Sequence, residues 1–177
     1  RDYYASRGLG DVYKRQVFIN GLKSYQPLPH RLQPLGEKDG IKYYDDSIST
    51  ICETTIQALN TLKDVDTVLI GGMDRGIDYS ELINFLSGHK VPHIILMEAT
   101  GKRILEEILN GYPDFQDKDR LVLTDHLEDA VAKAKELTRP GHSCLMSPAA
   151  ASYGIFKNFE ERGEVFARLV SGSDKLM

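Results

Sequence analysis

Short runs of β-branched and aliphatic residues alternate along the chain with longer segments in which apolar residues recur at helical spacing. From about Leu32 onward the alternation is regular, and it is typical of repeated strand–helix units. The runs that we predict to be strands are residues 41–44, 67–70, 93–97, 120–123 and 143–146. The last four are apolar enough to be covered on both faces, so we expect them to form the centre of a mostly parallel sheet.

Each predicted strand is followed by a segment of helical period. These segments are residues 50–62, 80–86, 102–109, 126–137 and 156–169. Two of them have start signals of the capping-box type, Thr50 with Glu53 and Asp125 with Glu128. The predicted class is therefore α/β, with a Rossmann-like, mostly parallel sheet and helices on both faces.

The beginning of the chain does not follow this pattern. Residues 1–16 show neither a strand period nor a helix period, and the composition changes abruptly at Val17. We expect this segment to be a non-native or disordered tail, such as a sequencing artefact read from an adapter, and leave it out of the fold. Residues 17–29, with Pro27 and Pro29 near their end, read as an interdomain linker from something upstream.

Composition narrows the class of protein further. A length of 177 residues fits one domain, and the net charge of −4 comes from interspersed charges without the basic stripe that nucleic-acid phosphates attract. Cys52 and Cys144 belong to no metal-binding spacing and are expected in the core or on a helix face, which fits a reducing, cytoplasmic compartment. The apolar runs are far shorter than the roughly 20 residues that span a bilayer. We therefore expect neither a nucleic-acid nor a membrane partner.

A glycine-rich turn follows the second predicted strand, at residues 71–76. Its glycines permit positive φ angles and close backbone approach, as a strand-to-helix turn requires. The turn matches neither GxGxxG nor GxxxxGK[ST], so it does not form a phosphate-binding loop by itself. Tight-turn packing and contact with an anionic ligand both remain open.

Two other segments could contact a ligand. Residues 45–50, DDSIST, lie between a strand and a helix, where helix capping explains Thr50 but does not require the paired aspartates Asp45 and Asp46. Arg31 could clamp a phosphate or carboxylate, although a surface arginine beside a linker is the simpler reading.

The segment 147–163, SPAAASYGIFKNFEERG, places a small-residue turn between an apolar strand and a helix. Ligands of open α/β sheets bind beyond the carboxyl ends of the strands, so Ser152, Lys157 and Phe159 fall at an expected crevice. The run from Glu160 to Arg162 reads as a solvated helix face. Four of the five histidines have no spacing typical of a metal site or a catalytic triad: His89, His93, His126 and His142.

Four motifs together carry a resemblance. LPHRL at 28–32, DDSISTICET at 45–54, GGMDRGIDY at 71–79 and the segment 147–163 are similar, in order and spacing, to the C-terminal domain of the Mur ligase family. The resemblance implies that residues 30–177 are a glutamate-binding domain and that the linker comes from a missing central ATPase domain. It also implies an ATP-dependent amide-bond ligase of peptidoglycan synthesis, in which glutamate attacks the phosphorylated carboxylate of UDP-N-acetylmuramoyl-L-alanine.

The resemblance also assigns roles to residues of this chain. Those expected to bind glutamate are Thr50, Arg75, Ser152 and Phe159, and those expected to reach the nucleotide are Arg31 and Asp46. Guanidinium groups, hydroxyls and helix N-termini suit the carboxylates of glutamate and the polyanion of ATP. No catalytic or metal-binding residue is implied within the chain, because ATP and Mg²⁺ would be bound mainly by the missing central domain. The partners expected are therefore the N-terminal and central domains of the same chain, and the fragment alone should be inactive.

One departure from the family leaves the substrate open. The family commonly has a lysine where this chain has Ile48, which leaves D- and L-glutamate as alternatives. An L-glutamate-adding or other amino-acid ligase of the same superfamily is therefore the first alternative. The second is a non-catalytic α/β module that binds an anionic metabolite.

Overall fold

One mixed sheet organises the fold. The computed structural model describes Val17 and residues 28–88, 91–115 and 117–172, and six strands of these residues pair in the order β1-β2-β6-β3-β4-β5. The strands are β1 Gln33–Lys38, β2 Ile41–Asp45, β3 Val65–Gly71, β4 His93–Met97, β5 Leu121–Thr124 and β6 Ser143–Met146. Only β1 is antiparallel to its neighbour, so the predicted, mostly parallel α/β sheet is confirmed.

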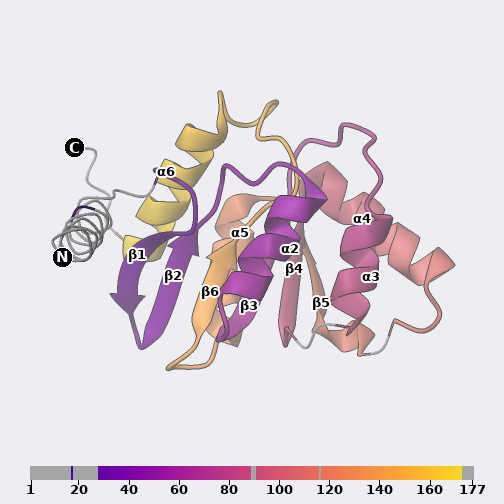
Figure 1. Ribbon diagram of the computed structural model, residues 1–177, viewed down its shortest axis with the longest axis horizontal. Coiled ribbons are helices and arrows are strands. Elements are labelled where there is room, and N and C mark those ends of the chain that lie inside the picture. Colours follow the sequence, from indigo (N-terminus) through magenta and orange to yellow (C-terminus); the bar gives the residue numbers. More distant parts are fainter. Residues whose placement is uncertain (1–16, 18–27, 89–90, 116, 173–177) are drawn as a thin grey trace, which may run out of the picture.

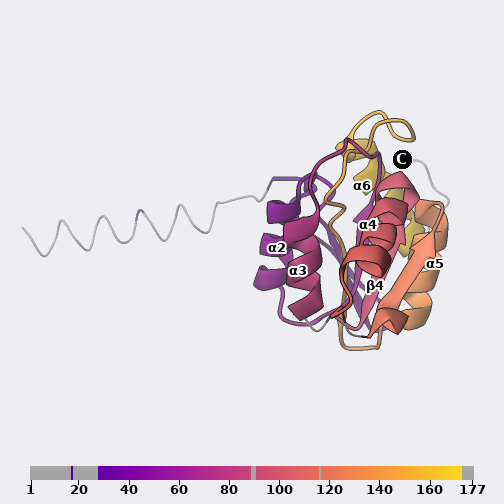
Figure 2. The same ribbon diagram turned by 90° about the vertical axis from the view of Figure 1, so that its right-hand side faces the viewer.

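Helices cover both faces of the sheet (Figure 1). They are α2 Cys52–Thr61, α3 Ser80–Gly88, α4 Glu98–Gly111, α5 Leu127–Leu137 and α6 Phe159–Ser171, with a short 3₁₀ helix at Lys118–Arg120. Figure 2 shows α2 and α3 on one side of the sheet and α5 on the other. Every predicted helix is present, with boundaries that differ by a few residues.

The core consists of two apolar layers, one on each face. One layer joins alternate strand residues such as Val68, Ile70 and Leu96 to apolar side chains of α2, α3 and α4. The other joins the intervening strand residues, such as Leu69 and Ile95, to α5 and α6. Burial on both faces explains why the central strands read as continuous apolar runs.

The predicted arrangement of the strands is wrong at both edges. β5, which we expected in the centre, is an edge strand with Leu123 exposed, and β2 lies inside between β1 and β6. β1 was not predicted, because its Pro34 and Gly36 hide the strand pattern. The signal that could have found it is Asp39-Gly40, where both residues have positive φ, as a two-residue hairpin turn requires.

The two predicted capping boxes are not formed. α2 begins after Ile51 and α5 begins after His126, and neither residue makes a side-chain capping hydrogen bond. Helix α6 does have a side-chain cap, because Asn158 Oδ1 accepts from the Glu161 N–H at 2.8 Å. Reciprocally, Glu161 Oε2 accepts from the N–H of Lys157 at 2.6 Å. This cap fixes the start of a helix that the candidate site uses.

Cys52 and Cys144 are buried free thiols, as predicted, and burial raises the pKa of both, to about 11 and about 12. Among the described residues, no helix is long and apolar enough to cross a membrane. The tail of residues 1–16 and residues 18–27 of the predicted linker lie outside the described residues, as does His89.

Candidate functional site

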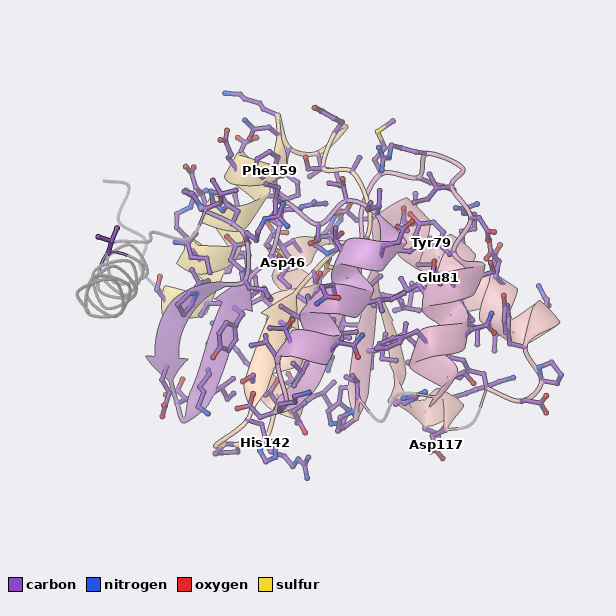
Figure 3. All side chains as sticks on the ribbon, viewed as in Figure 1. Asp46, Tyr79, Glu81, Asp117, His142 and Phe159 are labelled. Carbon is purple, nitrogen blue, oxygen red and sulfur yellow. The ribbon has the colours of Figure 1, made fainter. Side chains whose placement is uncertain are left out.

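The predicted ligand residues gather at the edge of the sheet where the parallel strands end. They lie on loops after β2, β3 and β6 and at the start of α6, except Arg31, which lies just before β1. Figure 3 shows Asp46 and Phe159 close together at this edge, while His142 and Asp117 lie at the opposite edge. The carboxyl edge is where open α/β sheets bind ligands.

The loops after β3 and β6 pair with each other at the point where the strand order reverses. The Gly71 N–H donates to the Pro148 carbonyl oxygen at 2.8 Å, and the Met73 N–H donates to that of Ala151 at 2.9 Å. Gly72, between them, has a φ of 154°. A Cβ on Gly72 would lie 2.5 Å from the Ala151 oxygen, so the pairing requires glycine there. Tight packing is therefore one role of this turn.

A buried hydrogen-bond network joins the loop after β2 to the loop after β6. Asp46 Oδ2 accepts from Ser147 Oγ at 2.7 Å, and Ser147 Oγ lies 3.0 Å from Thr55 Oγ1 on α2. Asp46 Oδ1 accepts from the Leu32 N–H at 3.1 Å. Burial raises the pKa of Asp46 even though these hydrogen bonds oppose the shift. The carboxylate thus holds backbone next to Arg31, whose own side chain is exposed.

His30 forms a pair that the sequence did not indicate. Its Nδ1 lies 2.7 Å from Asp45 Oδ2, and its ring meets the Phe159 ring edge-on with centroids 6.1 Å apart. The pair packs against Gly163 of α6, where a Cβ would collide with both His30 and Asp45. The glycine inside this helix therefore makes room for the pair, which in turn supports Phe159.

Arg162 is buried, so the prediction of a solvated face at residues 160–162 is wrong for this residue. Its side chain is 2% exposed. Its Nε donates to Ser47 Oγ (3.0 Å), and its Nη2 donates to the carbonyl oxygens of Ser47 (2.9 Å) and Ala150 (3.1 Å). Burial lowers the pKa of Arg162 to about 10, although Glu98 and Asp45 oppose the shift. One cation thus ties α6 to the loops after β2 and β6.

Two further hydrogen bonds link three of the four residues expected to bind glutamate. Arg75 Nη2 donates to the Thr50 carbonyl oxygen at 2.7 Å. Ser47 Oγ donates to the Phe159 carbonyl oxygen at 2.7 Å, which joins the loop that carries Thr50 to the start of α6. Ser152, the fourth, directly follows the Ala151 that pairs with Met73. Thr50 and Ser152 have no hydroxyl hydrogen bond to another described residue, so both can serve a ligand.

Metal binding has no support from the described residues. Among them, no group of three or more histidine, cysteine, aspartate or glutamate side chains is arranged to hold a metal ion. Of the histidines that lack the spacing of a metal site or a triad, His126 is exposed, and His142 Nδ1 lies 3.3 Å from the Pro140 carbonyl oxygen.

Comparison with known proteins identifies the family. No protein-family model matches the chain. The chain is 36% identical over 156 residues, 88% of its length, to a UDP-N-acetylmuramoylalanine–D-glutamate ligase of Thermoanaerobacter sp. (strain X514). It is 34% identical over 161 residues, 91% of its length, to the enzyme of the same name from Chlamydia caviae. The chain belongs to the Mur ligase family.

Two solved Mur ligases share its fold. A murein peptide ligase from Psychrobacter arcticus aligns over 88% of the chain with a TM-score of 0.57 and 14% identity. MurF ligase from Thermotoga maritima, solved in complex with ADP, aligns over 84% with a TM-score of 0.51 and 18% identity. The chain spans about a third of the length of these Mur ligases and of the two curated relatives, consistent with a C-terminal domain.

Proposed function

We propose that the chain is the C-terminal, glutamate-binding domain of an ATP-dependent ligase that joins D-glutamate to UDP-N-acetylmuramoyl-L-alanine. The observation that carries the proposal is the convergence of Arg75, Thr50 and Phe159, with Ser152 alongside, on hydrogen-bonded loops at one edge of the sheet. The names of the relatives at 34–36% identity support the choice of substrate.

The chemistry of the four side chains fits glutamate. Arg75 brings N–H groups in a fork that matches a carboxylate, and the hydroxyls of Thr50 and Ser152 can each donate one hydrogen bond. Phe159 offers an apolar surface for the methylene groups between the two carboxylates. In this proposal the four residues bind and orient glutamate so that its amine faces the activated substrate.

The proposed reaction requires the glutamate amine to face the alanyl carbonyl carbon. The glutamate amine would form a bond to the alanyl carbonyl carbon as the bond from that carbon to the phosphate oxygen breaks, and the amine would lose a proton. ATP, with Mg²⁺, would supply the phosphoryl group that activates the alanyl carboxylate. ATP and Mg²⁺ would be bound mainly by the central domain of the complete ligase.

In this proposal, Arg31 is the residue of this chain that contacts the nucleotide. Its guanidinium is exposed at the start of the described fold, beside a backbone that Asp46 holds in place. An exposed arginine on a fixed backbone suits a phosphate of the nucleotide. Asp46 would then assist nucleotide binding by keeping the backbone beside Arg31 in place.

Calorimetric titration of the 177-residue chain with D-glutamate, and separately with L-glutamate, tests the proposal. We expect saturable binding that favours D-glutamate and is lost in Arg75→Met, while the control Arg168→Met, an exposed arginine on α6, binds as before. Stronger binding of the L isomer would favour the L-glutamate-adding alternative. Binding of neither isomer would overturn the proposal.

A turnover assay tests the division of labour between domains. With ATP, Mg²⁺, UDP-N-acetylmuramoyl-L-alanine and D-glutamate, we expect no phosphate release by the chain alone, because its residues orient one reactant and leave the phosphoryl donor unplaced. Release of phosphate that depends on all of the substrates would contradict this expectation.

A further inference from the structure

The loop between β3 and α3, residues 72–79, carries Arg75 but has no regular secondary structure apart from the bridge at Met73. Its far end is held by Tyr79, whose hydroxyl donates to the Ala149 carbonyl oxygen at 3.1 Å. A loop fixed only at its two ends would let Arg75 sample many orientations. Holding an arginine side chain in one of them costs conformational entropy.

Arg103, on the second turn of α4, contacts the middle of this loop. Its Nε lies 3.0 Å from Asp74 Oδ2, and its Nη2 donates to the Ile77 carbonyl oxygen at 2.6 Å. The guanidinium carbon also lies 4.8 Å from the centroid of the Tyr79 ring. A planar guanidinium can make these three contacts at once, in three directions.

The contacts lie on both sides of Arg75. Asp74 directly precedes it, Ile77 follows two residues later, and the second Asp74 oxygen accepts from the Gly76 N–H at 2.8 Å. Between these anchors, Arg75 reaches across to the Thr50 carbonyl oxygen at 2.7 Å. The orientation of Arg75 therefore depends on a loop that Arg103 of α4 holds in place.

We propose that Arg103 is a positioning residue for the carboxylate of the incoming amino acid. It holds the loop so that Arg75 stays beside Thr50, with its remaining N–H groups directed at the ligand. Arg103 acts through Arg75 and not by contact, and the inference rests on the proposed function. Preorganisation of this kind increases affinity by removing an ordering cost at the moment of binding.

The test is a titration of the ¹⁵N-labelled 177-residue chain with D-glutamate, followed by NMR, for the unchanged chain, Arg103→Lys and Arg103→Met. The matched control is Arg139→Met, which breaks another arginine–aspartate pair, with Asp66, at the opposite edge of the sheet. The same spectra show whether each variant is folded. The ¹H–¹⁵N heteronuclear NOEs of residues 73–78 report the order of the loop.

We expect Arg103→Met to weaken glutamate binding about tenfold and to lower the NOEs of the loop, because the ordering cost returns. Arg103→Lys should bind about threefold more weakly than the unchanged chain, since an ammonium keeps the charge but loses the planar contacts. Arg139→Met should bind like the unchanged chain despite any loss of stability, which separates positioning from a general structural role.

Two results would count against the proposals, and they are distinguishable. If the unchanged chain binds glutamate and Arg103→Met binds it within about twofold, the proposed function stands and the inference on Arg103 is overturned. If the unchanged chain does not bind glutamate, the proposed function itself fails, and the role of Arg103 in ligand binding fails with it.

Discussion

Arg162 holds the candidate site together at the scale of a single residue. Its guanidinium bonds to Ser47 and Ala150, which lie 115 and 12 positions away in the chain. Its Nη1 has no hydrogen-bond partner among the described residues. A buried charge with so few partners is expensive, so its presence is better explained by the geometry it imposes on the loops than by stability alone.

Removing the Arg162 guanidinium should nevertheless lower the stability of the fold. We expect Arg162→Met to lower the free energy of unfolding by about 2–4 kcal/mol, because the Ser47 and Ala150 oxygens would lose a charged donor while buried. Urea unfolding measures the loss, with the exposed Arg168→Met as the control, expected to change it by less than about 0.5 kcal/mol. Equal effects in the two variants would contradict the role of Arg162.

Gly163 offers a second test at this scale. Alanine normally stabilises a helix interior by about 1 kcal/mol relative to glycine. Here its Cβ would collide with His30 and Asp45, so we expect Gly163→Ala to lower the free energy of unfolding by about 1–3 kcal/mol. The control is Gly111→Ala at the end of α4, where a Cβ meets nothing within 4 Å. A stabilising Gly163→Ala would show that the pair can move aside.

At the scale of elements, an ion pair joins the start of β3 to the turn between α5 and β6. Asp66 Oδ1 accepts from Arg139 Nη2 at 2.6 Å and Nε at 2.9 Å, and Asp66 Oδ2 accepts from the Arg139 N–H at 2.9 Å. Burial pushes the pKa of Asp66 upward, but these hydrogen bonds outweigh it and hold the pKa below its usual value. The pair thus ties the start of β3 to the turn that precedes β6, at the edge away from the site.

This lowered pKa predicts how stability depends on pH. A carboxyl whose pKa is lower in the folded state stabilises the fold at neutral pH and loses that contribution as the pH falls below about 4. We therefore expect urea unfolding to show a clear cost of Asp66→Asn at pH 7 and a smaller one at pH 3. The exposed Asp125→Asn, which breaks a pair with Lys102, should cost little at pH 7. A cost of Asp66→Asn that is the same at both pH values would contradict the assignment.

At the scale of the whole molecule, strands β1 to β6 form one sheet, and helices α2 to α6 cover it with an apolar core on each face. Residues 1–16 lie outside the described residues, and their exclusion from the domain stays a prediction from the sequence. Deleting them should change the free energy of unfolding by less than about 0.5 kcal/mol, because the sheet and both core layers stay intact. A larger loss in urea unfolding would show that the segment packs on the domain.

The sequence alone determined the elements with strong local patterns. The runs in β3, β4 and β6 are apolar because both faces are buried, and the 3.6-residue period of the helices reflects one buried stripe each. The motifs at 45–54, 71–79 and 147–163 also indicated the candidate site, because strand-to-helix loops meet at the carboxyl edge of a parallel sheet.

Only the tertiary structure decided the order of the strands, the place of β5 at an edge and the burial of Arg162. Local sequence carries no signal for these features, since they depend on which distant segments become neighbours. The charged run 160–162 reads as solvated until the loops that cover it fold over the helix. In the same way, Gly163 is an unfavourable helix residue in the sequence and becomes a requirement only when His30 and Asp45 pack against it.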